Sequence, residues 1–314
     1  MLTRPFGRSG LNLSVLGLGC GVVGGLMVRG SAADRERAIA MCRDAGVNYF
    51  DTAVQYGNGM SETHLGAALA ALGMQDAVVG TKVRLRSEQF GAIAETVSAS
   101  LEASLRRLGR DHVTVFHLHN VITQKGGGEA LSVGQVLGEV LPAFARLREA
   151  GKTRLVGITA VGETDALHEV IASGAVQSAQ IVINLINPTA VRPPPPGFTG
   201  QDYQELALAA QRQGCGGIGI RIVAGGALSG SMERHEIASP APAPIGSGDD
   251  YAADVAAAAR FLPLVREGRA GSLVEAAIRF AIAHDSIAPA LIGVASLEQV
   301  RTALDAAAKG PLAV

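Results

Sequence analysis

The amino-acid sequence predicts an α/β fold: a (β/α)8 TIM barrel with a short N-terminal β-hairpin. Three observations favour it. The length of 314 residues suits one such barrel, short apolar runs rich in β-branched residues alternate with helical patterns, and these strand-then-helix units number eight. An open nucleotide-binding sheet would more often show six strands and a second domain. We therefore expect one domain over residues 1–314.

The elements follow in chain order. A hairpin is expected within residues 3–15, because Gly7-Arg8-Ser9-Gly10 is typical of a turn. The eight predicted strands span 15–19, 47–51, 77–82, 113–119, 153–159, 177–183, 217–223 and 287–293. Two helices are expected to begin near Ser31 and Ser61, each with a hydroxyl cap and an acid close behind. The other predicted helices span 87–108, 132–150, 163–173, 202–213, 254–283 in two pieces, and 297–308.

Two segments fall outside this alternation. Residues 193–197 are four prolines and a glycine, which predicts a stiff connector before the sixth helix. Residues 225–250, rich in Gly, Ser, Pro and Ala, are too long for a simple turn after the seventh strand. We expect this second segment to be a lid over a bound cofactor.

Composition excludes several functions. The 27 basic and 28 acidic residues nearly balance, so the chain lacks the basic excess that nucleic acid binding requires. Every long apolar stretch is interrupted, so neither a secretion signal nor a membrane span is expected, and we predict a cytoplasmic protein. Three cysteines, far apart and without C-x-x-C spacing, indicate neither a disulfide framework nor a zinc site.

Four ionisable residues are predicted to meet at one rim. Asp51, Lys82 and His119 end the second, third and fourth strands, and Tyr56 follows in the loop after the second. A phenol has a pKa of about 10, which a nearby ammonium lowers, so Lys82 is expected to make Tyr56 a better acid. Asp51 would hold the ammonium, and His119 would orient a carbonyl oxygen. This arrangement suits protonation of an oxygen while hydride reaches the carbon.

Each of these residues also has an ordinary structural explanation. Asp51 could cap a turn, Lys82 could be solvated, and Tyr56 could simply be exposed in a glycine-rich loop. Their joint placement on successive strands favours catalysis.

The same residues carry a resemblance to a known family. Asp51-Thr-Ala-x-x-Tyr56-Gly-x-Gly-x-Ser-Glu62, Gly80-Thr-Lys82 and Asp111-His-Val-Thr-Val-Phe-His-Leu-His119 resemble, in order and spacing, the catalytic segments of aldo-keto reductases. The resemblance spans nearly the whole chain. It implies hydride transfer between NADP or NAD and an aldehyde, ketone or sugar carbonyl, with Tyr56 as general acid assisted by Lys82, Asp51 and His119.

The resemblance also implies a cofactor site. The residues implied are Thr159 and Gln180 against the nicotinamide carboxamide, and Gly293 and Gln299 near the adenosine phosphate. Where the family usually has an aromatic that stacks on nicotinamide, Arg221 offers a planar guanidinium instead. Ala160 replaces the asparagine that usually follows the residue at 159. The turn Gly293-Val-Ala-Ser296 lacks the cation that NADP-specific members carry, so we expect NAD to be accepted at least as well as it is by the usual NADP-preferring relative.

Three alternatives remain open from the sequence. Gly19-x-Gly21-x-x-Gly24 formally matches a dinucleotide fingerprint of an open sheet, although we expect a close-packed rim loop. His117-x-His119 could begin a zinc site, but it lacks further ligands at later strand ends, so we predict no metal. The chain could also be a cofactor-binding regulatory or sensor subunit with little turnover, or an NAD-dependent sugar dehydrogenase.

The substrate is the least defined part of the expected site. Only residues 309–314 follow the last helix, and the chain has no Trp, which predicts an open pocket tolerant of small aldehydes, sugars or bulkier ketones. The candidate pocket residues are Val22, Val23, Gln55 and Asn120. The sequence does not determine the oligomeric state.

Overall fold

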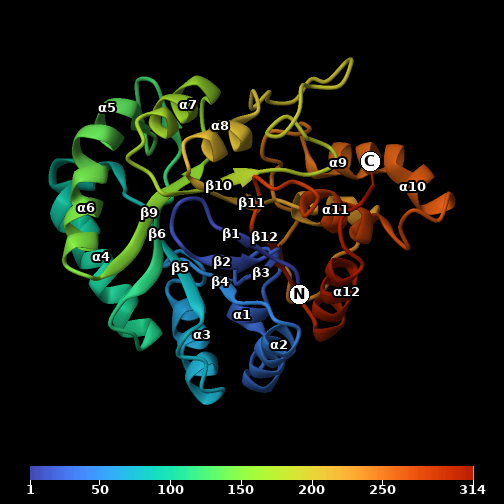
Figure 1. The fold of residues 1–314 in the computed structure, drawn as a ribbon, viewed down its shortest axis with the longest axis horizontal. Coiled ribbons are helices and arrows are strands. Elements are labelled where there is room, and N and C mark those ends of the chain that lie inside the picture. Colours follow the sequence, from blue (N-terminus) through green and yellow to red (C-terminus); the bar gives the residue numbers. More distant parts are fainter. Residues whose placement is uncertain (314) are drawn as a thin grey trace.

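The computed structural model, which describes residues 1–313, contains a closed barrel of eight parallel strands and so confirms the predicted fold (Figure 1). Each strand pairs with the next along the chain, and the last pairs with the first. The barrel strands are β3 Leu16–Gly19, β4 Tyr49–Asp51, β5 Val78–Val83, β6 Val113–Leu118, β9 Thr153–Ala160, β10 Ser178–Val182, β11 Gly216–Ile220 and β12 Ala290–Gly293. The dinucleotide-fingerprint alternative, which needs an open sheet, is therefore wrong.

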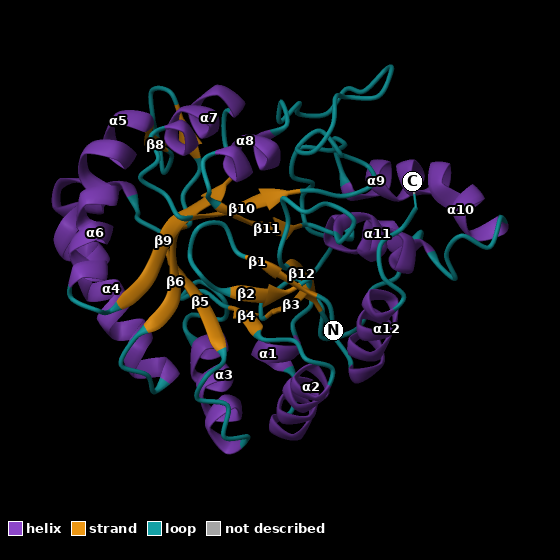
Figure 2. Ribbon diagram, in the orientation of Figure 1, coloured by secondary structure: helices purple, strands orange, loops and turns teal. Residues whose placement is uncertain are grey.

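Helices surround the ring of strands (Figure 2). They are α1 Leu26–Arg29, α2 Ala32–Asp44, α3 Met60–Ala71, α4 Ile93–Leu108, α5 Val133–Gln135, α6 Leu141–Glu149, α7 Thr164–Ala172, α8 Leu206–Arg212, α9 Tyr251–Ala258, α10 Leu262–Arg266, α11 Leu273–Ala281 and α12 Leu297–Ala308. Among residues 1–313, none of these helices has the length and apolar character needed to cross a membrane.

Local chemistry explains where the helices begin. The Ser31 side chain accepts a hydrogen bond from the backbone N–H of Asp34, as expected of a cap. Ser61, however, is not a cap: α3 begins one residue earlier, after Gly59, whose φ of 88° lies in the left-handed region. The Ser61 hydroxyl instead bonds inside the fold, to the Cys20 carbonyl and the Thr52 hydroxyl, both at 2.8 Å.

Three other local differences have physical causes. Helix α8 begins later than predicted because Gln204 and Glu205 have φ values of 50° and 57°, which no α-helix accommodates. The helix predicted over 132–150 contains one π turn, Val136–Val140. A small parallel sheet of β7 Ile122–Thr123 and β8 Leu131–Ser132 was not predicted, because strands of two residues leave no readable alternation.

The N-terminal hairpin closes the amino end of the barrel. Strands β1 Thr3–Pro5 and β2 Asn12–Ser14 pair antiparallel, as predicted, and lie across the ring in Figure 2. Phe6 and Leu13 are buried in one apolar cluster with barrel residues Tyr49, Val115, Leu155, Ile218 and Leu291. A side chain at Gly216 would overlap the Phe6 ring, so the missing Cβ makes room for it. The open end of the barrel is therefore the one at the carboxyl ends of the strands.

Candidate active site

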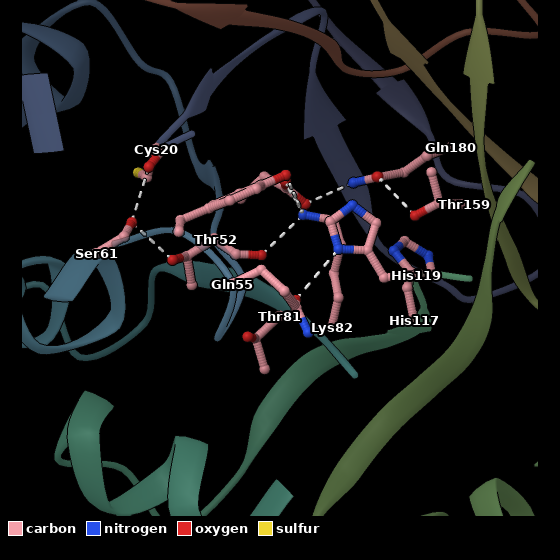
Figure 3. A network of polar contacts seen from close by, with 12 residues as sticks. Cys20, Thr52, Gln55, Ser61, Thr81, Lys82, His117, His119, Thr159 and Gln180 are labelled. Atoms are coloured by element: carbon pink, nitrogen blue, oxygen red, sulfur yellow. Dashed lines mark hydrogen bonds and ion pairs between the residues drawn. The ribbon is translucent and has the colours of Figure 1, made fainter. Parts of the chain in front are cut away.

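The four predicted catalytic side chains meet at the carboxyl end of the barrel. Lys82 lies on β5 and is completely buried (Figure 3). Its Nζ donates to the Asp51 carboxylate at the end of β4. The same ammonium donates to the Thr52 carbonyl at 2.8 Å and to the Tyr56 hydroxyl at 3.3 Å. A buried ammonium is tolerated only with such partners, so these three acceptors account for its place in the core.

Burial and the neighbouring charges shift the pKa values of Lys82 and Asp51 in opposite directions. Burial lowers the pKa of Lys82, but the Asp51 carboxylate and Tyr56 more than offset this, so the pKa lies above its ordinary value and the amine stays charged. Burial also raises the pKa of Asp51, against the effect of its Lys82, Tyr49 and Gln180 donors.

The pKa of Tyr56 differs from the expectation. Burial raises it, and although Lys82 acts to lower it, the net direction is upward from its ordinary value. Lys82 thus lowers the pKa of the phenol, as expected, but burial outweighs it, because a neighbouring charge can be read from a sequence and the loss of water cannot. The consequence is that Tyr56 keeps its proton at neutral pH.

Two predicted cofactor residues extend the network from Asp51. The second Asp51 oxygen accepts from Gln180 Nε2 at 2.6 Å, and Gln180 Oε1 accepts from the Thr159 hydroxyl at 3.2 Å (Figure 3). A single chain of hydrogen bonds thus joins Thr159 on β9 to Tyr56 in the loop after β4. Because every link is fixed by a partner, the network holds Asp51 and Lys82 in one geometry.

His119 follows β6 beside the phenol. Its ring stands edge-on to the Tyr56 ring, with centroids 5.9 Å apart, and its Nδ1 lies 3.3 Å from Gln55 Oε1. Burial, with the positive charges of Lys82 and Arg84, lowers the pKa of His119 to about 3. The imidazole is therefore neutral at any physiological pH and offers one N–H donor.

His117, unlike His119, does not line the cavity. Its side chain is buried in the barrel, its Nε2 contacts the Ser178 hydroxyl at 2.9 Å, and burial lowers its pKa well below the ordinary value. Within residues 1–313, no group of three or more His, Cys, Asp or Glu side chains gathers in a metal-binding arrangement. Burial raises the pKa of Cys42 and of Cys215 to about 12, which keeps these thiols unreactive.

A cavity of about 600 Å³ opens above this network. Its wall contains most of the predicted site residues, namely Asp51, Tyr56, His119, Thr159, Gln180, Arg221, Gly293, Gln299 and Val23. The cavity runs between the two regions that the family resemblance assigns to nicotinamide and to adenosine. Its third arginine besides Arg84 and Arg221 is Arg234, from the predicted lid segment.

Three of the predicted substrate residues do not line the cavity. The Val22 carbonyl accepts a hydrogen bond from Arg29, and Gln55 is exposed and contacts His119; neither residue lines the cavity. Asn120 is 1% exposed, and its amide bonds the Leu85 backbone and the Glu129 carbonyl. The expectation that Asn120 touches substrate was wrong, because its amide is consumed in joining two loops.

The predicted lid segment, residues 225–250, contributes part of the cavity wall and is tied to the loop after β3. The Arg234 guanidinium donates to the carbonyls of Gly225 and Ser239, both at 2.8 Å, and to that of Val23 at 3.3 Å. From the other side, Arg29 donates to the Ile237 carbonyl at 2.6 Å. Sequence reasoning missed both arginines; the available signal was a lone cation within each glycine-rich stretch.

An ion pair between Glu62 and Arg107 connects two helices to the strand that carries Lys82. The Glu62 side chain, which is fully buried in α3, accepts from the Thr81 hydroxyl and from Arg107 Nε, each at 2.6 Å. Thr81 directly precedes Lys82 on β5, so this pair joins α3 and α4 to the strand that carries the ammonium. The motif containing Glu62 was recognised, but this contact was not predicted.

Comparison with known proteins identifies the family to which this chain is similar. The family model described as Aldo/keto reductase family matches residues 15–313, and the chain belongs to this family. L-galactose dehydrogenase of Arabidopsis thaliana is 37% identical over 161 residues, which are 50% of this chain and 47% of that protein. Pyridoxal 4-dehydrogenase of Microbacterium luteolum is 24% identical over 331 aligned positions, covering 95% of this chain and 90% of that protein.

The solved structures agree with this assignment. An aldo-keto reductase from Bacillus halodurans in its holo form superposes with a TM-score of 0.72 at 25% identity, covering 99% of this chain and 92% of that one. The match to L-galactose dehydrogenase, in contrast, spans about half the length of either protein.

Proposed function

We propose that this protein is an NAD(P)-dependent oxidoreductase that transfers hydride between a nicotinamide and the carbonyl carbon of an aldehyde, ketone or sugar. The observation that carries the proposal is the contact of 3.3 Å between Lys82 Nζ and the Tyr56 hydroxyl at the wall of the cavity. A phenol with a buried cation behind it is a proton donor whose conjugate base is stabilised where it forms.

The chain's own residues divide the work on the oxygen. Tyr56 gives its proton to the carbonyl oxygen, and Lys82, held by Asp51, stabilises the phenolate left behind. His119 donates its Nε2–H to the same oxygen, which requires Nδ1 to be the acceptor atom. The Gln55 amide meets that requirement when its NH2 group, rather than its oxygen, faces Nδ1. A bound nicotinamide supplies or accepts the hydride.

The cavity suits a dinucleotide. Thr159 and Gln180 would meet the carboxamide, Arg221 would lie against the nicotinamide or a phosphate, and Gly293 and Gln299 would border the adenosine end. A Cβ on Gly293 would have no neighbour nearer than 3.7 Å, so that wall leaves room for a ligand. Helix α12, capped by Ser296, directs the positive end of its dipole to the same region.

Coenzyme preference follows from the charges on this wall. Near Gln299 the described lining consists of Val294, Ala295, Thr302 and Ala303, and Arg301 beside them is exposed. A 2′-phosphate there would have no close cation, so NAD should be used at least as well as NADP. Michaelis constants for NADH and NADPH measure this. A hundredfold advantage for NADPH would contradict it.

The Tyr56→Phe variant tests the proposed chemistry. It removes the proton donor and keeps the ring, so we expect kcat to fall by about a thousandfold while the coenzyme Kd changes less than about threefold. Absorbance of NADH with a panel of carbonyl compounds measures the first quantity and calorimetry the second. Full activity in this variant would exclude the assigned acid.

The same panel separates an enzyme from a sensor subunit. A regulatory protein would bind NADH tightly and fail to oxidise it with any carbonyl at a useful rate. Assays with alcohols and sugars in the presence of NAD⁺ test the dehydrogenase direction, because the residues that protonate the oxygen also deprotonate a hydroxyl.

A further inference from the structure

One cation in the cavity wall, Arg84, neither donates to nor holds the reacting oxygen in the proposed chemistry. Arg84 directly follows β5, and the backbone N–H of His119 donates to the neighbouring Val83 carbonyl at 2.7 Å. Arg84 and His119 therefore leave adjacent strand ends side by side, and both line the cavity. The charge of Arg84 also contributes to the lowered pKa of His119.

The position of Arg84 separates it from the other cavity arginines. In the ring of eight strands, β5 lies four strands from β11 in either direction, so Arg84 faces Arg221 across the mouth. Arg234 spends its guanidinium on the lid carbonyls and the Tyr251 hydroxyl. With the coenzyme on the Arg221 side, Arg84 is the cation left on the far side of Tyr56 and His119.

Arg84 is held in place by a built framework. Its Nη2 donates to Glu129 at 2.7 Å, and both side chains are about half exposed. The buried Asn120 amide fixes the backbone on both sides of this ion pair, through the Leu85 N–H at 2.8 Å, the Leu85 carbonyl at 2.7 Å and the Glu129 carbonyl at 2.8 Å. A solvated surface pair needs no buried amide to align its two backbones.

We infer that Arg84 is an anion-recognition residue for the substrate, so that the preferred carbonyl compound carries a carboxylate or phosphate group. The guanidinium is a planar fork with five donors, and it matches the two oxygens of such a group. Among the described residues, Glu129 takes a hydrogen bond from one of its nitrogens, which leaves donors for a ligand. This inference rests on the proposed function only for its carbonyl part.

Glu129 sets the strength of the subsite. It follows three glycines, Gly126 to Gly128, whose φ values of 72°, 124° and 57° all lie in the left-handed region. Its carboxylate competes with that of a substrate for the same guanidinium. Removing the charge of Glu129 should therefore strengthen anion binding, whereas removing that of Arg84 should abolish the preference.

Paired substrates test the inference. The assay compares succinic semialdehyde with butanal, and glyceraldehyde 3-phosphate with glyceraldehyde, in the wild type and in Arg84→Gln, Glu129→Gln and Arg86→Gln. Arg86 is the matched control, since it forms a similar exposed pair with Glu88 at 3.0 Å but does not line the cavity. Melting temperatures verify that all variants are folded.

The expected pattern is specific. The wild type should favour the charged member of at least one pair, and Arg84→Gln should lower kcat/KM for that member by about tenfold, mainly through KM, with the neutral member changed less than about twofold. Glu129→Gln should raise kcat/KM for the charged member by about threefold, and Arg86→Gln should change neither. The responding pair distinguishes carboxylate from phosphate recognition.

Three results would overturn the inference: equal losses for charged and neutral substrates in Arg84→Gln, a wild type that prefers the neutral members of both pairs, or no effect of Arg84→Gln on charged substrates and benzoate. Calorimetry with benzoate and benzamide, titrated into the protein with NAD⁺ bound, separates failure of this inference from failure of the proposed function. Benzoate binding that depends on Arg84, without turnover of any carbonyl, would retain the subsite and reject the reductase. Turnover with benzoate binding and charged-substrate kinetics unaffected by Arg84→Gln would do the reverse.

Discussion

At the residue scale, the site is governed by the competition between burial and charge. Lys82 is paired with Asp51, yet the loss of water around Tyr56 outweighs the ammonium and keeps the phenol protonated. In the proposed reaction, the phenol would keep its proton until a substrate oxygen is present to receive it. His119, with a pKa of about 3, adds a neutral donor rather than a second charge.

The two reaction directions should consequently differ in their pH dependence. Reduction needs protonated Tyr56, whose pKa is raised, so kcat/KM should stay level from about pH 5 to pH 9 and fall only at higher pH. Oxidation needs the phenolate and should rise with pH throughout that range. Initial rates in both directions, in buffers of constant ionic strength, measure this. An inflection between about pH 6 and pH 8 in reduction would contradict the assignment of a neutral His119.

The sequence predicted which strand-end residues lie close together, but not all of the contacts that these residues make. Asp51, Lys82 and His119 were predictable because strand ends converge in any parallel barrel. Asn120 was misassigned, because a polar residue after a strand can face a cavity or a loop, and its partners lie 35 and 9 residues away. Arg84 was not recognised at all, since a cation beyond a strand end is usually solvated.

At the scale of elements, the predicted lid segment is anchored by two arginines. Arg234 and Arg29 bond to backbone carbonyls on both sides of the opening and so join residues 225–250 to the loop after β3. Carbonyl acceptors are carried by every residue, so no side-chain pattern marks them in a sequence. The length and composition of the segment were readable, whereas its anchors were not.

The variant Arg234→Gln should loosen the lid. It removes hydrogen bonds to three carbonyls and the Tyr251 hydroxyl, so we expect the coenzyme Kd to rise about tenfold through a faster dissociation rate. Stopped-flow displacement of NADH measures that rate. Arg37→Gln, an exposed change on α2, is the control. An unchanged dissociation rate would show that the lid does not retain the coenzyme.

At the scale of the whole molecule, the regular repetition of strand and helix made the architecture predictable. Eight units leave few arrangements other than a closed ring, and the hairpin ahead of them was readable from its turn. What the hairpin does was not readable. Its Phe6 fills a space that Gly216 leaves empty on β11, 210 positions further along the chain, and such a match exists only in three dimensions.

The Phe6→Ala variant tests the role of that plug. It should lower the free energy of unfolding by about 3 kcal/mol, because it empties a volume enclosed by the barrel floor. Urea denaturation followed by circular dichroism measures the change. Leu2→Ala, at a side chain that is 51% exposed, should cost less than about 0.5 kcal/mol. Catalysis should survive in both variants at moderate temperature, since the residues proposed to react lie at the other end of the barrel.

The hairpin that closes the amino end of the barrel determines where the protein can be immobilised. Met1 is 36% exposed and leads into the hairpin, at the end of the barrel remote from the cavity. A biotin or affinity handle appended there would anchor the molecule to a sensor chip with its mouth turned toward the flowing solution. Grafting the handle in place of the first fourteen residues would instead withdraw Phe6 and Leu13 and uncap the cylinder.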